Sequence, residues 1–163
     1  MGYTIDLTRG DEVWNSSQVW YLEFDNFNAP ITNEITEWPW REAYYTINVC
    51  NFILSRTGND DANLSEAMKR IKGQALFLRA FSYFNLAGYY QNVPLITDYD
   101  TYSTLDGLYG KTNSYDEVLD QVEADFKEAM TLLPSRDEGG EWAKGRATCG
   151  SAAGYYARAL ICL

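Results

Sequence analysis

Residues 74–86 read QALFLRAFSYFNL, a mostly apolar run whose only charged residue is Arg79. The run belongs to a longer pattern in which apolar residues recur every three or four positions, the spacing of one helical face. That face comprises Leu64, Met68, Ile71, Ala75 and Leu78, widened by Phe77, Phe81 and Phe84. The pattern predicts a core helix over residues 63–90, packed on several sides, with Asn63 and Glu66 spaced like a capping box.

Three further helices are indicated on either side of this run. Apolar spacing from Trp40 to Leu54 predicts a helix over residues 39–57, with Pro39 in its first turn and Gly58 as its stop. Ser114 followed by Glu117 is a capping box that opens a helix over residues 114–133. Thr148 can cap a fourth helix over residues 148–163, rich in small residues.

The helices contain an internal repeat. The motif Gly73-Gln-Ala75 with Ala80 recurs 77 residues later as Gly150-Ser-Ala152 with Ala157. We therefore predict an all-α, tetratricopeptide-like α-α superhelix made of two helical hairpins with long loops. Such repeats normally need about three copies to close a core, and the last helix is still apolar at its end. We expect a domain over residues 37–163 that is truncated at its C-terminal end, and self-association of the fragment.

Two segments are too long and too aromatic to be simple connections. Residues 1–36 are predicted to be an irregular, aromatic-rich segment, and residues 91–113 a long loop. Aromatic rings stack on the C–H faces of sugars and place polar tips at their edges. Exposed rings in these segments are therefore candidates for carbohydrate binding, and packing on the superhelix is the alternative for each. The candidates are Trp14, Trp20, Tyr21, Tyr99, Tyr102 and Tyr109.

Composition excludes several functions for this 163-residue chain. A net charge of −10 disfavours nucleic acid as a partner. The absence of histidine removes Ser-His-Asp and Cys-His catalysis and every zinc site that needs histidine. The three cysteines lack C-x-x-C spacing and are predicted to be buried thiols. The acidic stretches around residues 98–100 and 137–141 do not match a calcium loop, so no metal and no cofactor are expected.

An ordered series of motifs over residues 38–163 resembles the SusD/RagB family. The series begins with Trp40 and Tyr44-x-x-Ile47-x-x-x-Asn51-x-Ile53-Leu54, and continues with residues 74–86 and Tyr90-x-x-Val93-Pro94-Leu95. Downstream it includes Asp125-x-x-x-Ala129, Leu133-Pro134, Gly145-Arg146 and Thr148. The family usually has Tyr-Gly before Val-Pro, whereas Gln91-Asn92 follow Tyr90 here, so the turn should differ.

The resemblance implies a surface-exposed outer-membrane lipoprotein that captures a glycan or oligosaccharide and caps a SusC-like TonB-dependent transporter, without catalysis. The 163 residues themselves show neither signal-peptide regions nor an apolar run near the roughly 20 residues of a membrane span, so we expect this chain to lack signal and anchor.

The alternatives are a helical-repeat scaffold for protein–protein interaction and a small carbohydrate-active enzyme. The scaffold would have a charge-patterned groove and short loops; the enzyme would need two facing carboxylates.

Other residues are assigned to structure. Trp38, Trp40, Tyr44, Tyr83 and Phe84 match the family's packing pattern and are expected in the core. Asn51 and Arg79 interrupt apolar stretches and must find partners, with loop carbonyls or a helix end as the expected ones. Residues 63–90 carry a charge of +3 and residues 114–128 a charge of −5, which favours these two helices as neighbours.

Overall fold

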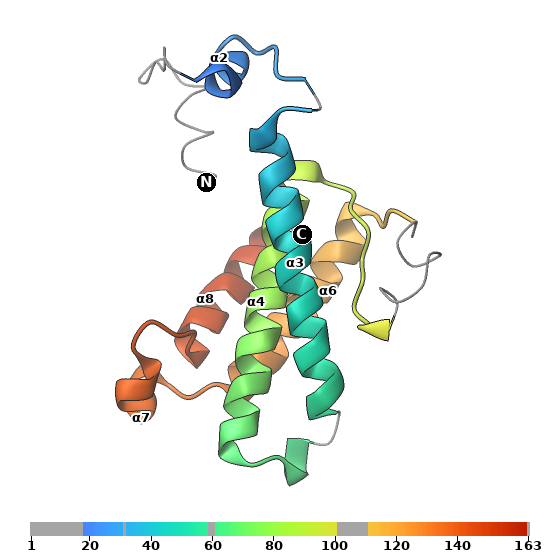
Figure 1. Ribbon diagram of the computed structural model, residues 1–163. Coiled ribbons are helices and arrows are strands. Elements are labelled where there is room, and N and C mark those ends of the chain that lie inside the picture. Colours follow the sequence, from blue (N-terminus) through green and yellow to red (C-terminus); the bar gives the residue numbers. More distant parts are fainter. Residues whose placement is uncertain (1–17, 31, 59–60, 101–110, 163) are drawn as a thin grey trace. The chain divides into compact units, whose positions relative to one another are not determined.

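The computed structural model describes residues 18–30, 32–58, 61–100 and 111–162 (Figure 1). The chain divides into two compact units, residues 1–43 and residues 44–163. The described elements in chain order are α2 (Val19–Asp25), α3 (Glu34–Thr57), η1 (Asp61–Asn63), α4 (Glu66–Tyr90), α6 (Tyr115–Leu132), α7 (Arg136–Gly139), η3 (Gly140–Ala143) and α8 (Cys149–Cys162). The described residues contain no strand beyond an isolated bridge between Pro94 and Thr112, which confirms the predicted all-α class.

The first unit is more helical than predicted. Residues 19–25 form α2, where an irregular segment was expected, and α3 begins at Glu34 instead of Pro39. Asn33 accounts for the early start, because its side-chain oxygen accepts a hydrogen bond of 2.8 Å from the Ile35 amide, as an N-cap does. Its amide group also donates to the Trp20 carbonyl and to the Glu23 carboxylate, at 3.1 and 2.6 Å. One capping residue therefore fixes α2 against the start of α3.

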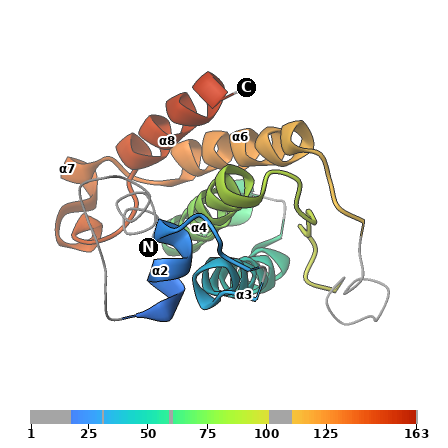
Figure 2. The same ribbon diagram turned by 90° about the horizontal axis from the view of Figure 1, so that it is seen from above.

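The second unit contains the two predicted helical hairpins. Residues 44–57 of α3 lie beside α4, and α6 lies beside α8, with α4 also against α6 (Figures 1 and 2). Gly73 permits a close approach of α4 to the end of α6, because a Cβ there would lie 2.9 Å from Leu133. Gln74 joins α4 to the residue before the α8 cap, donating to the Ala147 carbonyl at 2.6 Å and accepting from its amide at 3.2 Å. The second and fourth predicted helices are thus neighbours.

The core lies between α4, α6 and α8. Leu76, Ala129, Leu133 and Ala152 form its buried centre. The Tyr155 ring of α8 lies 5.2–6.3 Å from the rings of four phenylalanines of α4 and α6, namely Phe77, Phe81, Phe84 and Phe126. The phenylalanines that widen the apolar face of α4 therefore do so by packing against both neighbouring helices.

Two packing predictions were wrong in part. Ile71 and Leu78, expected on the buried face of α4, are 46% and 43% exposed. Because α4 is apolar around most of its circumference, periodicity alone did not show which side faces the core. Trp38 is 48% exposed instead of buried, whereas Tyr83 is fully buried as expected. A large aromatic side chain on a surface helix need not be covered completely.

The predicted helix starts are confirmed at two of three caps in this unit. Ser114 and Glu117 form the capping box of α6, with bonds of 3.3 and 2.8 Å. The Thr148 hydroxyl accepts from the Ser151 amide at 3.4 Å, at the start of α8. Helix α4 is capped by Ser65, whose hydroxyl accepts from the Met68 amide at 3.3 Å, while Asn63 belongs to η1. Serine and asparagine both cap helices. Ser65 adopts the extended backbone that an N-cap requires.

Candidate functional site

The segment after α4 is fixed to the first hairpin by side chains of α3 and α4. The Tyr44 hydroxyl donates to the Pro94 carbonyl at 2.7 Å. The Tyr83 hydroxyl donates to the Ile96 carbonyl at 2.9 Å and accepts from the Ile96 amide at 2.7 Å. The Asn51 amide group donates to the same carbonyl at 2.9 Å. These bonds fix residues 94–96 to α3 and α4, just ahead of Thr97 and Tyr99.

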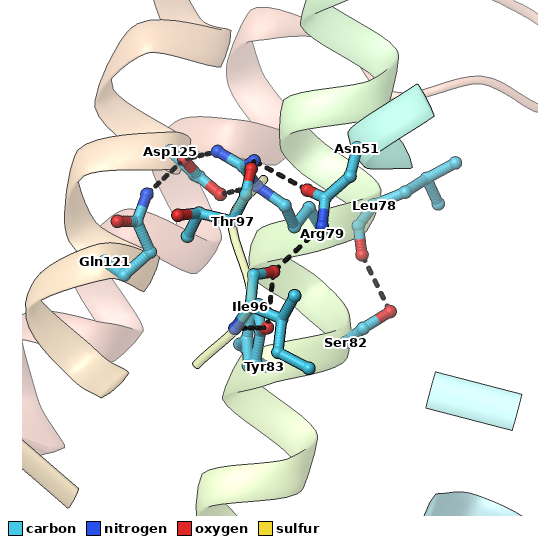
Figure 3. Close-up of polar contacts among 9 residues, drawn as sticks. All are labelled: Asn51, Leu78, Arg79, Ser82, Tyr83, Ile96, Thr97, Gln121 and Asp125. Atoms are coloured by element: carbon cyan, nitrogen blue, oxygen red, sulfur yellow. Dashed lines mark hydrogen bonds and ion pairs between the residues drawn. The ribbon is translucent and has the colours of Figure 1, made fainter. Parts of the chain in front are cut away.

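Arg79 is the centre of a buried polar network (Figure 3). Its Nε and Nη2 atoms donate to the two carboxylate oxygens of Asp125 on α6, both at 2.7 Å. Its Nη1 atom donates to the Asn51 side-chain oxygen at 2.9 Å and to the Thr97 carbonyl at 3.1 Å. Gln121 donates to Asp125 at 2.8 Å. Arg79 thereby links α3, α4, α6 and the segment after α4.

The negative charge of Asp125 stabilises the buried cation of Arg79. Burial disfavours the Arg79 cation, but the hydrogen bonds and negative charge of Asp125 outweigh burial and raise the pKa of Arg79 above its ordinary value. A second ion pair lies two turns earlier on α4, where Lys72 Nζ lies 2.8 Å from Glu128 Oε1. The Lys72 side chain is only 6% exposed. Two cations of α4 are therefore matched by two carboxylates of α6.

A polar cavity of about 380 Å³ lies next to these ion pairs. We call it the Tyr99 pocket. Its walls come from the end of α3, from α4, from α6 and from residues 97–99. The lining residues used below are Ser55, Lys72, Arg79, Tyr99, Gln121 and Glu128. The Tyr99 ring packs edge-on against Phe52 with ring centroids 5.1 Å apart, so its position at the rim is defined.

A second, apolar groove of about 620 Å³ runs between α3 and α4 on the side of η3. Val49, Ile71 and Leu78 line it and are 41–46% exposed. At one end, the guanidinium groups of Arg70 and Arg146 each lie 5.2 Å from the Trp142 ring centroid. Cations held over the ring occupy the aromatic surface that a sugar would use. The groove therefore suits apolar contacts better than sugar stacking.

Comparison with known proteins identifies the family. A family model described as starch-binding and associating with the outer membrane, of the SusD-like type, matches residues 3–161. The chain belongs to the SusD-like family. This confirms the resemblance seen in the helical motifs.

Relatives of this SusD-like chain are considerably longer than 163 residues. SusD-like protein P2 of Formosa agariphila is 33% identical over 116 residues, which is 69% of this chain and 22% of the relative. A SusD-like carbohydrate binding protein from Bacteroides vulgatus superposes with a TM-score of 0.77 at 27% identity, over 97% of this chain and 35% of its own. A laminarin binding SusD-like protein superposes with a TM-score of 0.72 at 24% identity, over 98% and 37%. The chain thus spans 22–37% of these relatives.

Of the six predicted carbohydrate-binding residues, three fall within the described part of this SusD-like chain. Trp20 and Tyr21 lie on α2 in the first unit. Trp20 is 38% exposed, and its ring nitrogen donates to the Gln18 side chain at 3.2 Å. Tyr99 lies in the second unit at the rim of the Tyr99 pocket and is half-buried. Trp14, Tyr102 and Tyr109 lie outside the described residues, so their role stays a prediction.

Sequence reasoning anticipated part of the polar network. Asn51 and Arg79 were expected to bond to loop carbonyls, and the carbonyls of Ile96 and Thr97 are among their partners. The Asp125 partner of Arg79 was not predicted. The opposite charges of the two helices pointed to such a pair, because both ion pairs join α4 to α6. Which carboxylate meets which cation depends on the helix register, which composition does not give.

The SusD-like chain offers oxygen ligands in several places, but they do not gather into a metal site in the described part of the chain. No group of three or more cysteine or acidic side chains is placed to hold an ion there. Within the same residues, none of the helices combines the length and hydrophobicity needed to cross a bilayer.

Proposed function

We propose that this chain is the N-terminal helical part of a surface-exposed outer-membrane lipoprotein that captures a glycan and hands it to a SusC-like TonB-dependent transporter. The observation that carries the proposal is the family match over residues 3–161, whose description names starch binding and the outer membrane. The laminarin named for one structural relative adds a second neutral glucan to the ligands of related proteins. The sugar contacts we propose are the aromatic residues of the two long segments.

The placement of the described rings supports this role. Trp20 presents part of its ring to solvent while its nitrogen is held by Gln18, and Tyr99 is held by Phe52 beside a polar pocket. A ring that is fixed before binding loses little conformational freedom when a sugar stacks on it. The fused ring of Trp20 and the phenol of Tyr99 also provide the mixed apolar and polar surface that a pyranose requires.

We propose that the protein binds without catalysis. A glycosidase of the usual kind needs an acid and a base or nucleophile facing each other across the scissile bond. In the Tyr99 pocket, Glu128 is held by Lys72 at 2.8 Å, and Asp125 beside it is held by Arg79. Each of these carboxylates is thus held by a cation and is not free to face a scissile bond. Incubation with laminarin should therefore release no reducing ends above the rate of a heat-denatured sample.

Affinity electrophoresis tests the proposed glycan contacts. The wild-type chain should be retarded in native gels that contain laminarin, and replacing Trp14, Trp20 and Tyr102 together by alanine should abolish the retardation. Helical circular dichroism should stay nearly the same, because none of the three residues belongs to α3, α4, α6 or α8. Replacement of the exposed Tyr89 by alanine is the matched control. Unchanged retardation of the triple variant would place binding elsewhere.

We also propose that the chain associates with itself. Ile161 is 86% exposed and Leu160 45% exposed at the end of α8, and the groove between α3 and α4 is a second exposed apolar area. Exposed apolar surface of this kind invites a partner. Sedimentation velocity should show dimers or larger species that diminish in the Ile161→Glu variant. A concentration-independent monomer for the wild-type chain would contradict the proposal.

A further inference from the structure

The Tyr99 pocket has the composition of a small polar ligand site and contains polar atoms without protein partners. Four N–H groups of Arg79 bond to Asp125, Asn51 and Thr97, so one of the five donors of the guanidinium, on Nη2, has no acceptor among the described residues. Arg79 as a whole is 7% exposed and lines the pocket. A buried donor of this kind is costly unless water or a ligand satisfies it.

An acceptor lies in the same pocket. Gln121 donates its amide to Asp125 at 2.8 Å, and its side-chain oxygen has no donor within the described part of the chain. Gln121 and Arg79 both line the pocket, and among the described residues they carry one acceptor and one donor without a protein partner. Tyr99 adds an aromatic ring and a phenol at the rim. Hydroxyl groups, which both donate and accept, match this set better than a ligand that only accepts or only donates.

The size of the pocket limits the ligand. A cavity of about 380 Å³ is at the lower end of the roughly 300–1,000 Å³ typical of small-molecule sites. This volume suits one or two sugar rings. We propose that the Tyr99 pocket binds a terminal neutral sugar residue of a glycan, with Tyr99 against a ring face and Arg79 and Gln121 bonded to hydroxyl groups. The inference rests on the proposed function and adds a subsite to it.

The paired charges of the Tyr99 pocket favour a neutral sugar over an acidic one. Both cations of the pocket already have carboxylate partners, Lys72 with Glu128 and Arg79 with Asp125. An entering carboxylate or sulfate would have to compete with these partners and would leave a buried carboxylate unpaired. The chain also carries a net charge of −10, which repels anions at longer range. Uronic acids and sulfated sugars should therefore be excluded.

A steric variant tests the subsite without breaking an ion pair. Ser55 is an exposed lining residue whose hydroxyl bonds only locally, to the Phe52 carbonyl at 2.8 Å, so Ser55→Trp should fill the pocket mouth. Thr131→Trp is the matched control, because Thr131 is also exposed, makes the same kind of bond to Glu128 and does not line the pocket. Gln121→Met, which removes the acceptor at similar volume together with the amide that donates to Asp125, is a second variant should Ser55→Trp lose helical circular dichroism.

The readout is titration of the intact chain with laminaribiose and with a dimannuronate, followed by the backbone amide signals of Thr97 and Tyr99, which line the pocket, in NMR spectra. We expect laminaribiose to shift these signals, Ser55→Trp to weaken its binding at least tenfold, Thr131→Trp to leave it unchanged, and dimannuronate to have no effect. Unchanged laminaribiose binding in Ser55→Trp, or equal binding of dimannuronate, would overturn the subsite. Retardation of the same chain by laminarin in native gels would then still support the proposed function. If the chain neither binds laminaribiose nor is retarded by laminarin, both the subsite and the proposed function are refuted.

Discussion

Arg79 of α4 and Asp125 of α6 form a bidentate ion pair in the interior of the second unit, with both nitrogen–oxygen distances at 2.7 Å. The side chains are 8% and 3% exposed, so the pair has lost most of its hydration. Such a pair is stable only when its remaining hydrogen-bonding groups are satisfied. Most of these groups bond to Asn51, Thr97 and Gln121. The pair therefore specifies how two hairpins and one loop fit together.

The first prediction concerns the loss of one partner. Asp125→Ala leaves the Arg79 cation buried without its carboxylate and should lower the free energy of unfolding by about 3–5 kcal/mol, measured by urea denaturation. The comparison is Arg41→Ala, which breaks an exposed pair with Glu37 and should cost at most about 1 kcal/mol. Equal effects of the two substitutions would show that the buried pair does not hold the hairpins together.

A second prediction uses the glycines of α4. Gly73→Ala would place a Cβ 2.9 Å from Leu133 and should destabilise the chain by about 1–3 kcal/mol through overpacking. Gly88→Ala meets nothing within 4 Å and should stabilise it by about 0.5–1 kcal/mol, because alanine is the better helix former. Thermal melting of the two variants should shift in opposite directions. A shift in the same direction would mean that α4 and α6 do not approach closely at Gly73.

The third prediction concerns the turn after α4. Gln91 has a φ of 63°, a conformation that glycine adopts without strain and other residues adopt at a cost. Gln91→Gly should raise the free energy of unfolding by up to about 1 kcal/mol, whereas Asn92→Gly should not, since Asn92 lacks a positive φ and its side chain accepts from the Tyr115 amide. Destabilisation by Gln91→Gly would contradict this account of the turn.

A fourth prediction follows from the cysteines. Burial raises the pKa of Cys50 to about 11, against the lowering effect of the Arg79 charge. Because this value lies above the ordinary 9.0 of a free thiol, folding favours the protonated form. The stability that the protonated Cys50 thiol contributes is complete below pH 9 and is lost as the pH rises from 9 through 11. In Cys50→Ala, the decline in melting temperature over this range should be smaller than in the wild-type chain.

Thiol labelling gives an independent check of the same feature. The prediction of buried thiols holds for Cys50 and is wrong for Cys162, which is exposed. Iodoacetamide at pH 8 should therefore modify Cys162 first and Cys50 only after denaturation. The sites are identified by mass spectrometry of tryptic peptides. Rapid modification of Cys50 in the folded chain would show that the α3–α4 contact opens readily.

The sequence was most informative where a local signal decides the structure. The Ser114–Glu117 box defines the start of α6 to the residue, since the cap is made by neighbours in the chain. Pro39 was misleading, because the Asn33 cap, which is bonded to Trp20 and Glu23, extends α3 past the usual position of a proline. Likewise, three helices and a loop together form the Tyr99 pocket. Residue spacing along the chain does not predict that these elements pack against one another.

We propose above all that this chain binds neutral glycans, and saturation-transfer difference NMR detects such binding in solution. The intact wild-type chain is mixed with laminarihexaose, and with hexamannuronate as the acidic comparison. We expect transfer to the ring protons of laminarihexaose and none to hexamannuronate. The absence of transfer to laminarihexaose, from a chain whose circular dichroism shows it to be helical, would contradict the claim.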